Sequence, residues 1–153
     1  MDENATTTTT TTIDITQLSI YLKKANEIAS VSKMMGGVVL QDLIKGQDIA
    51  GVLLAKAVQA DIKAKARLEQ AEAIAYLDKA SDYLKERNLK DSSEARKRYV
   101  DIDPDVITAK DNKAKTEALV ALMKNKLSIL RQAHDDLKKI LYGDQHMTNY
   151  EGM

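Results

Sequence analysis

The sequence predicts an all-α fold built from long helices, because of its composition and two extended helical patterns. The 153 residues include one proline and six glycines, with no phenylalanine, tryptophan or cysteine. Hydrophobic residues make up 44% and charged residues 30%, which excludes a wholly disordered chain. The stretches 49–88 and 104–142 repeat small and apolar side chains at helical spacing, which argues against a β-sandwich.

The expected elements begin with an acidic, threonine-rich arm. Residues 1–12 end in seven consecutive threonines without apolar partners, so we expect this arm to be disordered. Asp14 and Gln17 resemble a capping box at the start of a helix over 14–35, which Gly36 and Gly37 should end. Two further helical turns are expected over 38–45, ending before Gly46.

The remaining elements are two long helices and a short one between them. Asp48 is a candidate cap for a helix over 49–88. Asp91 with Glu94 forms a second possible capping box, which starts a short helix over 91–100. Asp103 followed by proline is the clearest helix start, so the last helix should run over 104–142. The single domain 13–142 is followed by a polar tail, 143–153.

A heptad pattern in the last helix predicts oligomerisation. Its apolar side chains alternate between spacings of four and three residues, which is typical of a coiled-coil seam over about three heptads. A helix over 49–88 is about 60 Å long at ~1.5 Å per residue, too long for one 153-residue globule to cover. We therefore expect a homo-oligomer. Beginning at Thr116, the predicted oligomerisation residues are Val120, Met123, Leu127, Leu130, His134, Leu137 and Leu141.

Positive charge is concentrated in the middle of a chain whose net charge is zero. Residues 52–98 carry 11 basic and 8 acidic side chains, whereas 1–51 carry 4 and 6, and 99–153 carry 8 and 9. The absence of cysteine excludes disulfides and thiolate metal ligands and is compatible with the cytosol. No basic-then-apolar leader follows the first methionine. Charged residues interrupt the most apolar run, so we expect no membrane span.

A basic stripe on the middle helix is the main candidate site. At ~100° per residue, Lys56, Lys63 and Arg67 fall within about 20° of one another, without a carboxylate on their line. Flexible cations without competing acids suit phosphate contacts, and they favour nucleic-acid binding. Lys65 points the other way and has acids at i−4 and i+4. A solvated helix face without a ligand is the alternative.

Arg96, Lys97, Arg98 and Tyr99 form a second basic cluster, in which the tyrosine is placed to stack on a base. The alternative is a surface turn of helix with a half-buried tyrosine.

The sequence offers no candidate catalytic residue, metal ligand or cofactor site. The aspartates from Asp101 to Asp105 alternate as in a calcium loop, but Val106 and Asn112 stand where the glycine and the closing glutamate belong. The two histidines lack ligand-spaced companions, and no phosphate-binding glycine motif is present. We therefore expect a protein that is not an enzyme.

Three short motifs, in order, resemble the UvsY family of recombination mediators from T-even-type bacteriophages. Ile13-Asp14-Ile15-Thr16-Gln17-Leu18 is similar to the opening of that family. Lys65-Ala66-Arg67-Leu68 matches its Lys-Ala-Arg-Leu motif. Asp103-Pro104-Asp105-Val106-Ile107 resembles the stretch before its last helix.

The resemblance implies a non-enzymatic, ring-like oligomer that binds single-stranded DNA in the host cell cytoplasm. It implies contacts with the phage recombinase and the single-strand-binding protein, and a role in loading the former during homologous recombination, replication and DNA repair. Lys65 and Arg67 would be the DNA contacts of the motif. A structural helical adaptor or assembly chaperone without a nucleic-acid role is the alternative. A peripheral membrane binder using 34–58 is disfavoured by its acidic residues.

Overall fold

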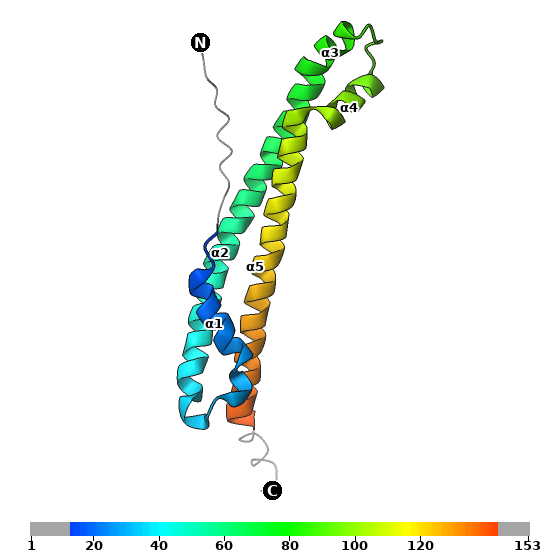
Figure 1. Ribbon diagram of the computed structural model, residues 1–153. Coiled ribbons are helices and arrows are strands. Elements are labelled where there is room, and N and C mark those ends of the chain that lie inside the picture. The colour runs from blue at the N-terminus through cyan, green and yellow to red at the C-terminus, as the bar shows by residue number, and fades with distance from the viewer. Residues whose placement is uncertain (1–12, 144–153) are drawn as a thin grey trace, which may run out of the picture. The chain divides into compact units, whose positions relative to one another are not determined.

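The computed structural model describes residues 13–143, which are mostly helical and contain no strand (Figure 1). The predicted all-α class is therefore confirmed. The predicted arm 1–12 and the tail from residue 144 onward lie outside the described residues. The elements in chain order are α1 (Thr16–Asn26), the 3₁₀ turn η1 (Ile28–Ser30), α2 (Lys33–Ile74), the π-helix η2 (Ala75–Lys79), α3 (Ala80–Glu86), α4 (Ser93–Ile102) and α5 (Pro104–Tyr142).

The described chain divides into two compact units. Unit 1 contains residues 13–53 and 129–143, and unit 2 contains residues 54–128. The helices α2 and α5 contribute a segment to each unit. All the predicted DNA-binding residues belong to unit 2.

In unit 1, α1 packs beside the first part of α2. Lys24, in the last turn of α1, forms an ion pair with Asp42 of α2, where its charge also suits the helix dipole. Asp14 accepts a hydrogen bond from the Thr16 amide at 2.8 Å, so it holds the entry to α1. The predicted capping box with Gln17 is not formed, because the helix has no side-chain cap bond at its first position. The core of unit 1 consists of Leu18, Ala25, Leu43, Ala50, Leu53, Leu130, Ala133 and Leu137.

The glycines of α2 do not end helices, so the breaks predicted at Gly36 and Gly46 are wrong. The chain instead turns earlier, between Asn26 and Lys33. A Cβ added at Gly46 would lie 2.7 Å from Cβ of Tyr21, and one at Gly36 would lie 2.5 Å from Cδ1 of Leu141. These glycines therefore allow α1 and α5 to approach α2 closely, and the burial that results offsets their low helix propensity.

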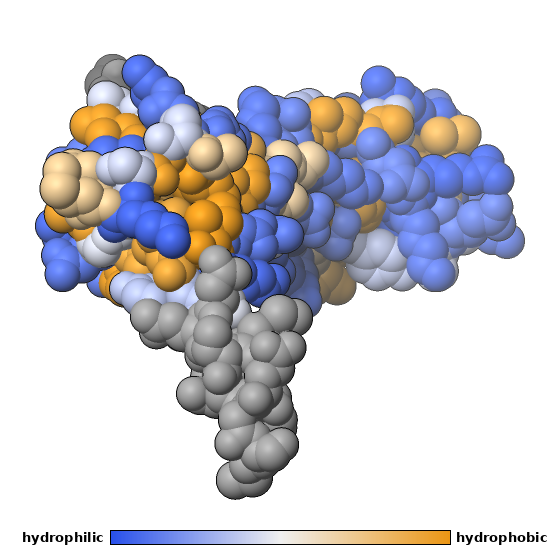
Figure 2. Space-filling model, turned by 90° about the horizontal axis from the view of Figure 1, so that it is seen from below, coloured by the Kyte–Doolittle hydropathy of each residue, from blue (hydrophilic) through white to orange (hydrophobic). Residues whose placement is uncertain are grey.

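Unit 1 also exposes apolar side chains where α2 begins and α5 ends. Met34 is 89% exposed, and Met35, Val38 and Ile140 are each about half exposed. Figure 2 shows hydrophobic surface gathered at this near end of the molecule. Flexible methionines on an exposed apolar surface are typical of protein interaction sites.

In unit 2, the segments of α2 and α5 run antiparallel and side by side (Figure 1). Asp61 of α2 contacts Lys113 and Thr116 of α5, which fixes their register. The buried residues of α2 here are alanines, and their small size lets the two helices approach closely. The core of unit 2 consists of Ala57, Ala64, Ala75, Ala80, Leu84, Val106, Met123 and Leu127.

The heptad residues of α5, which were predicted to join copies, are covered within one chain. Met123, Leu130 and Leu137 have no exposed surface, and Leu127 is 9% exposed. The seam at Val120, His134 and Leu141 is only partly exposed. These residues therefore serve the intrachain core and leave little apolar surface for a second copy.

The end of α3 is a Schellman motif centred on Asn88. Asn88 has a φ of 55°, the left-handed conformation that asparagine tolerates better than most residues. The Leu89 amide donates to the Leu84 carbonyl at 2.9 Å, and the Asn88 amide donates to the Lys85 carbonyl at 3.1 Å. This turn brings the chain back toward α4 and leaves Leu89 beside Leu84.

The caps of the last two helices differ in how well the sequence predicts them. Ser92, one residue after the predicted Asp91, caps α4 by accepting from the Ala95 amide at 3.2 Å. Asp103 caps α5 as predicted, and it accepts from the amides of Asp105 and Val106 at 3.0 and 3.2 Å. The predicted cap at Asp48 is wrong, because this residue lies inside α2.

Alanine substitutions should show which glycines of α2 are needed for the close approach of a neighbouring helix. We expect Gly37→Ala to raise the free energy of unfolding by about 0.5–1 kcal/mol, because nothing lies within 4 Å of the added Cβ. Gly46→Ala should lower it by about 1–3 kcal/mol, because Tyr21 must move. Urea unfolding of both variants measures this, and equal shifts would contradict the close approach at Gly46.

Candidate nucleic-acid interface

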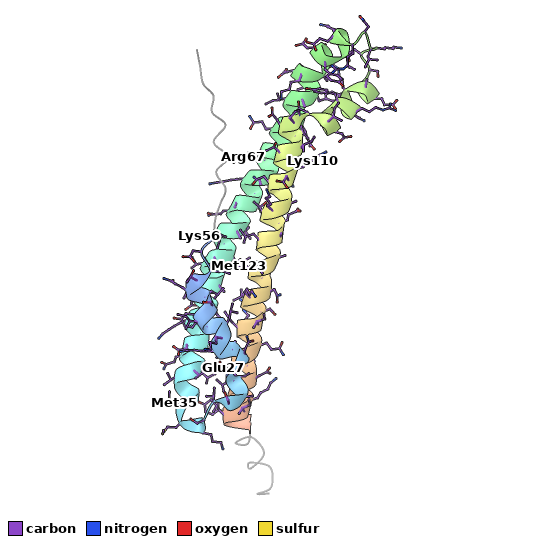
Figure 3. All side chains as sticks on the ribbon, viewed as in Figure 1. Glu27, Met35, Lys56, Arg67, Lys110 and Met123 are labelled. Atoms are coloured by element: carbon purple, nitrogen blue, oxygen red, sulfur yellow. The ribbon has the colours of Figure 1, made fainter. Side chains whose placement is uncertain are left out.

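Three cations form an open line along the unit 2 segment of α2. Lys56, Lys63 and Arg67 are exposed, and no ion pair to any of them occurs among residues 13–143. Their spacing of seven and four residues places them on one side of the helix. Lys56 and Arg67 are labelled on α2 in Figure 3, where Met123 lies on the neighbouring α5. The structure thus places the predicted stripe on an accessible surface.

The one carboxylate between Lys56 and Arg67 in the sequence, Asp61, points to another side of the helix and is bound by α5. Asp61 accepts hydrogen bonds from Lys113 Nζ at 3.0 Å and from Thr116 Oγ1 at 2.8 Å. The hydrogen bond from Lys113 is the main cause that lowers the pKa of Asp61, so this carboxyl stays ionised and paired. Asp61 therefore does not compete with a phosphate for the cations of the line.

Lys65 is paired within its own helix, but weakly. Its Nζ lies 3.9 Å from Glu69 Oε1, and the two side chains are 68% and 67% exposed. An ion pair this exposed contributes about 0–1 kcal/mol, so Lys65 can leave it at little cost. The other acid that the sequence places near Lys65, Asp61, is taken by α5.

Within the second predicted cluster, Arg96 and Tyr99 are engaged in the structure. Arg96 binds both carboxylate oxygens of Asp91 at 2.7 Å and donates to the Tyr76 carbonyl at 3.2 Å. The Tyr99 ring lies against Tyr83 with centroids 4.7 Å apart, and its hydroxyl donates to Asp103 at 2.9 Å. Burial raises the pKa of Tyr99, with that hydrogen bond adding to the effect. Both side chains therefore have structural contacts.

Lys97 and Arg98 of the same cluster are exposed. Lys97 has no ion pair among residues 13–143, and Arg98 has only an exposed pair with Glu94 at 2.7 Å. The structure therefore divides the predicted cluster into two structural and two accessible side chains. No hydrogen bond or ion pair within the described part of the chain joins it to the line on α2.

An apolar stripe lies beside the cationic line, on the side of α2 opposite its buried alanines. At ~100° per residue, Ala55, Val58, Ile62 and Ala66 lie about 150° from Ala57 and Ala64, with the cations between the two faces. Val58 is 37% exposed and Ile62 is 63% exposed. This helix therefore carries its larger apolar side chains outward and its smaller ones inward.

A buried polar network at Asp103 was predicted only in part. Asp103 is 1% exposed, caps α5, and lies 3.3 Å from Lys79 Nζ of the π-helix η2. Lys79 also pairs with Asp105, and this hydrogen bond is the main cause that raises the pKa of Lys79. The proline after Asp103 indicates the cap, but no sequence signal identifies Lys79 or Tyr99 as its partners.

Comparison of the chain with protein-family models, with curated proteins and with solved structures finds no match. Among residues 13–143, no cluster of three or more potential ligands is arranged to hold a metal ion. None of the described helices combines the length and the hydropathy needed to cross a bilayer.

Acid should weaken the fold through Asp103. Burial alone would raise its pKa, but hydrogen bonds from Tyr99, from the Val106 amide and from Lys79 outweigh burial and lower it. A lowered folded pKa means that the stabilisation is complete above the unfolded value of about 3.9 and is lost as pH falls below it.

We expect Asp103→Asn to lower the free energy of unfolding at pH 7 by about 1–3 kcal/mol, because Lys79 and the α5 amides lose a charged acceptor. The difference from wild type should shrink as pH falls from about 5 to about 2. Urea unfolding across this range measures it. A difference that stays constant would show that Asp103 does not contribute through its charge.

Proposed function

We propose that this chain binds single-stranded DNA along the unit 2 segment of α2 and acts as a recombination mediator. The observation that carries the proposal is the line formed by Lys56, Lys63 and Arg67, which is exposed and has no carboxylate partner among residues 13–143. Cations without competing acids can neutralise phosphates and release their counterions, which supplies most sequence-independent affinity for nucleic acids.

The line spans about 16 Å at ~1.5 Å per residue, so each copy offers a short binding track. Lys65 is a weaker contact, because a phosphate must first displace Glu69. The mediator role and the recombinase and single-strand-binding protein partners rest on the similarity of the three motifs to the UvsY family.

Association of copies is part of this proposal. The cationic line of one copy is short, and several linked copies would bind a strand more tightly than one. The heptad residues of α5 are covered within the chain, so we place the contact between copies on the apolar stripe of α2. Ile62 is 63% exposed and Val58 is 37% exposed there. A ring-like arrangement would present one cationic line from each copy to a strand.

The second candidate is a structural adaptor without a nucleic-acid role. It is favoured by the exposed apolar surfaces, the stripe on α2 and the methionine-rich end of unit 1, which suit protein partners. The two functions differ in their need for positive charge. An adaptor would keep its partners when the cationic line is removed.

Removing the line should weaken DNA binding specifically. We expect the double variant Lys63→Ala, Arg67→Ala to bind a single-stranded oligonucleotide at least about tenfold more weakly, because two phosphate contacts are lost. The slope of log K against log salt should fall by about 0.7 for each charge removed. Fluorescence anisotropy at several salt concentrations measures both.

Lys65→Ala is the matched control, because it removes one charge from the same helix but from the opposite side. We expect it to cost less than either Lys63→Ala or Arg67→Ala. The proposal fails if the double variant keeps its oligomeric state and binds as tightly as wild type at equal salt. The adaptor function would then be the better explanation.

An aspartate introduced on the apolar stripe of α2 should prevent copies from associating without unfolding the chain. Ile62→Asp replaces an exposed side chain, so we expect it to dissociate copies while the chain stays folded. Leu130→Asp places a charge in the core of unit 1, so it should lower the free energy of unfolding by about 4 kcal/mol or more. Sedimentation and circular dichroism of both variants measure this, and a wild-type chain that is monomeric at micromolar concentration would refute the contact between copies.

A further inference from the structure

An open cleft lies between α3 and α4 in unit 2, outside the cationic line on α2. Its volume is about 470 Å³, within the range of about 300–1,000 Å³ that is typical of ligand pockets. Leu84 and Tyr83 of α3 line one side, and Tyr99 and Ile102 of α4 line the other. Leu89, from the turn between these helices, completes an apolar lining.

Several contacts hold the aromatic lining of the cleft in place. Tyr99 is fixed by its hydroxyl bond to buried Asp103 and by its contact with Tyr83. The guanidinium of Arg87 lies 3.9 Å from the centroid of the Tyr83 ring. Leu89 is placed by the Schellman turn at Asn88. A preformed site loses less entropy when a ligand binds.

The lining of the cleft also combines exposed aliphatic surface with positive charge. Leu89 is 53% exposed and Ile102 is 54% exposed, so both have apolar surface left to bury. Lys90 and Arg98 also line the cleft, together with one carboxylate, Glu94, so the charged side chains of the lining are two basic and one acidic. Lys90 has no ion pair among residues 13–143, and the pair of Arg98 with Glu94 is weak because both side chains are about four-fifths exposed.

We propose that this cleft binds a short protein segment in which aliphatic side chains are flanked by carboxylates. The aliphatic side chains lie against Leu84, Leu89 and Ile102, while the carboxylates meet Lys90 and Arg98. A nucleobase fits less well, because it stacks on a free aromatic face and the contacts with Arg87 and Tyr99 already cover Tyr83. The cleft therefore gives the chain a protein-docking site separate from its DNA track.

The test uses the full chain and a fluorescein-labelled peptide, acetyl-Gly-Asp-Leu-Leu-Asp-Glu-Gly-amide, in fluorescence anisotropy. We expect a dissociation constant below about 100 µM. Replacing the peptide leucines with serine, or its acids with lysine, should weaken binding at least about tenfold. A thymidine oligonucleotide in excess should not displace the peptide.

Variants of the chain locate the site. Lys90→Glu should weaken peptide binding about tenfold, whereas the matched reversal Lys85→Glu, on α3 but outside the cleft, should leave it within about twofold. Ile102→Ser should weaken binding about fivefold, and Ile107→Ser, equally exposed on α5, should have no effect. Circular dichroism checks that each variant is folded.

The Lys63→Ala, Arg67→Ala variant should bind the peptide as wild type does, so failure of the DNA proposal leaves this one intact. Absence of peptide binding overturns the proposal. So does equal binding of the serine and lysine peptides, or an equal effect of the Lys90 and Lys85 reversals. Displacement by the oligonucleotide would show that the cleft is part of the nucleic-acid surface and would also overturn it.

Discussion

Unit 2 depends on one buried carboxylate, that of Asp103. It caps α5 through two backbone amides, accepts from Tyr99 of α4, and lies within ion-pair distance of Lys79 of the π-helix η2. A carboxylate that is 1% exposed is stable only when such partners satisfy it, so α4, α5 and the π-helix are fixed together at one point. The same carboxylate positions Tyr99 and, through it, the contact with Tyr83. Both of these rings line the cleft.

Competition among acids decides which cations of unit 2 remain available. The segment 52–98 carries 11 basic side chains, but Arg96 is held by Asp91 and Lys79 by Asp103 and Asp105. These ion pairs connect different parts of the fold, so a ligand cannot take their cations without breaking structural contacts. The exposed pairs of Lys65 and Arg98 differ, because a ligand can displace them at little cost. A count of basic residues in the sequence therefore overstates the accessible positive surface, because Arg96 and Lys79 are held in structural contacts.

Composition, proline placement and long periodicity predicted well, whereas single capping residues such as Asp48 and signals that depend on tertiary contacts did not. The all-α class, the cap at Asp103 and the full extent of α5 follow from composition, proline placement and periodicity. The breaks expected at Gly36 and Gly46 failed because those glycines accommodate neighbouring helices, which is visible only when Leu141 and Tyr21 are in place. The exposed stripe Lys56, Lys63, Arg67 was found by helical angle alone. A half-buried Tyr99 was one of the two expected alternatives, but the partners of Arg96 and Tyr99 were not predicted, because Tyr76, Tyr83 and Asp103 come from other turns and elements.

The π-helix η2 acts as a phase shift in the run from α2 to α3. Ala75 and Ala80 are both fully buried, although positions five apart in an α-helix point about 140° away from each other. A π-turn closes hydrogen bonds over five residues and so returns these two alanines to the same face. The side chains after Lys79 in that run, including Leu84 in the cleft, therefore keep the direction that they would have without the additional residue. If residues 75–79 closed as regular α-turns instead, the additional residue would turn α3 by about 100° and point Leu84 away from the cleft, without any change of side chain.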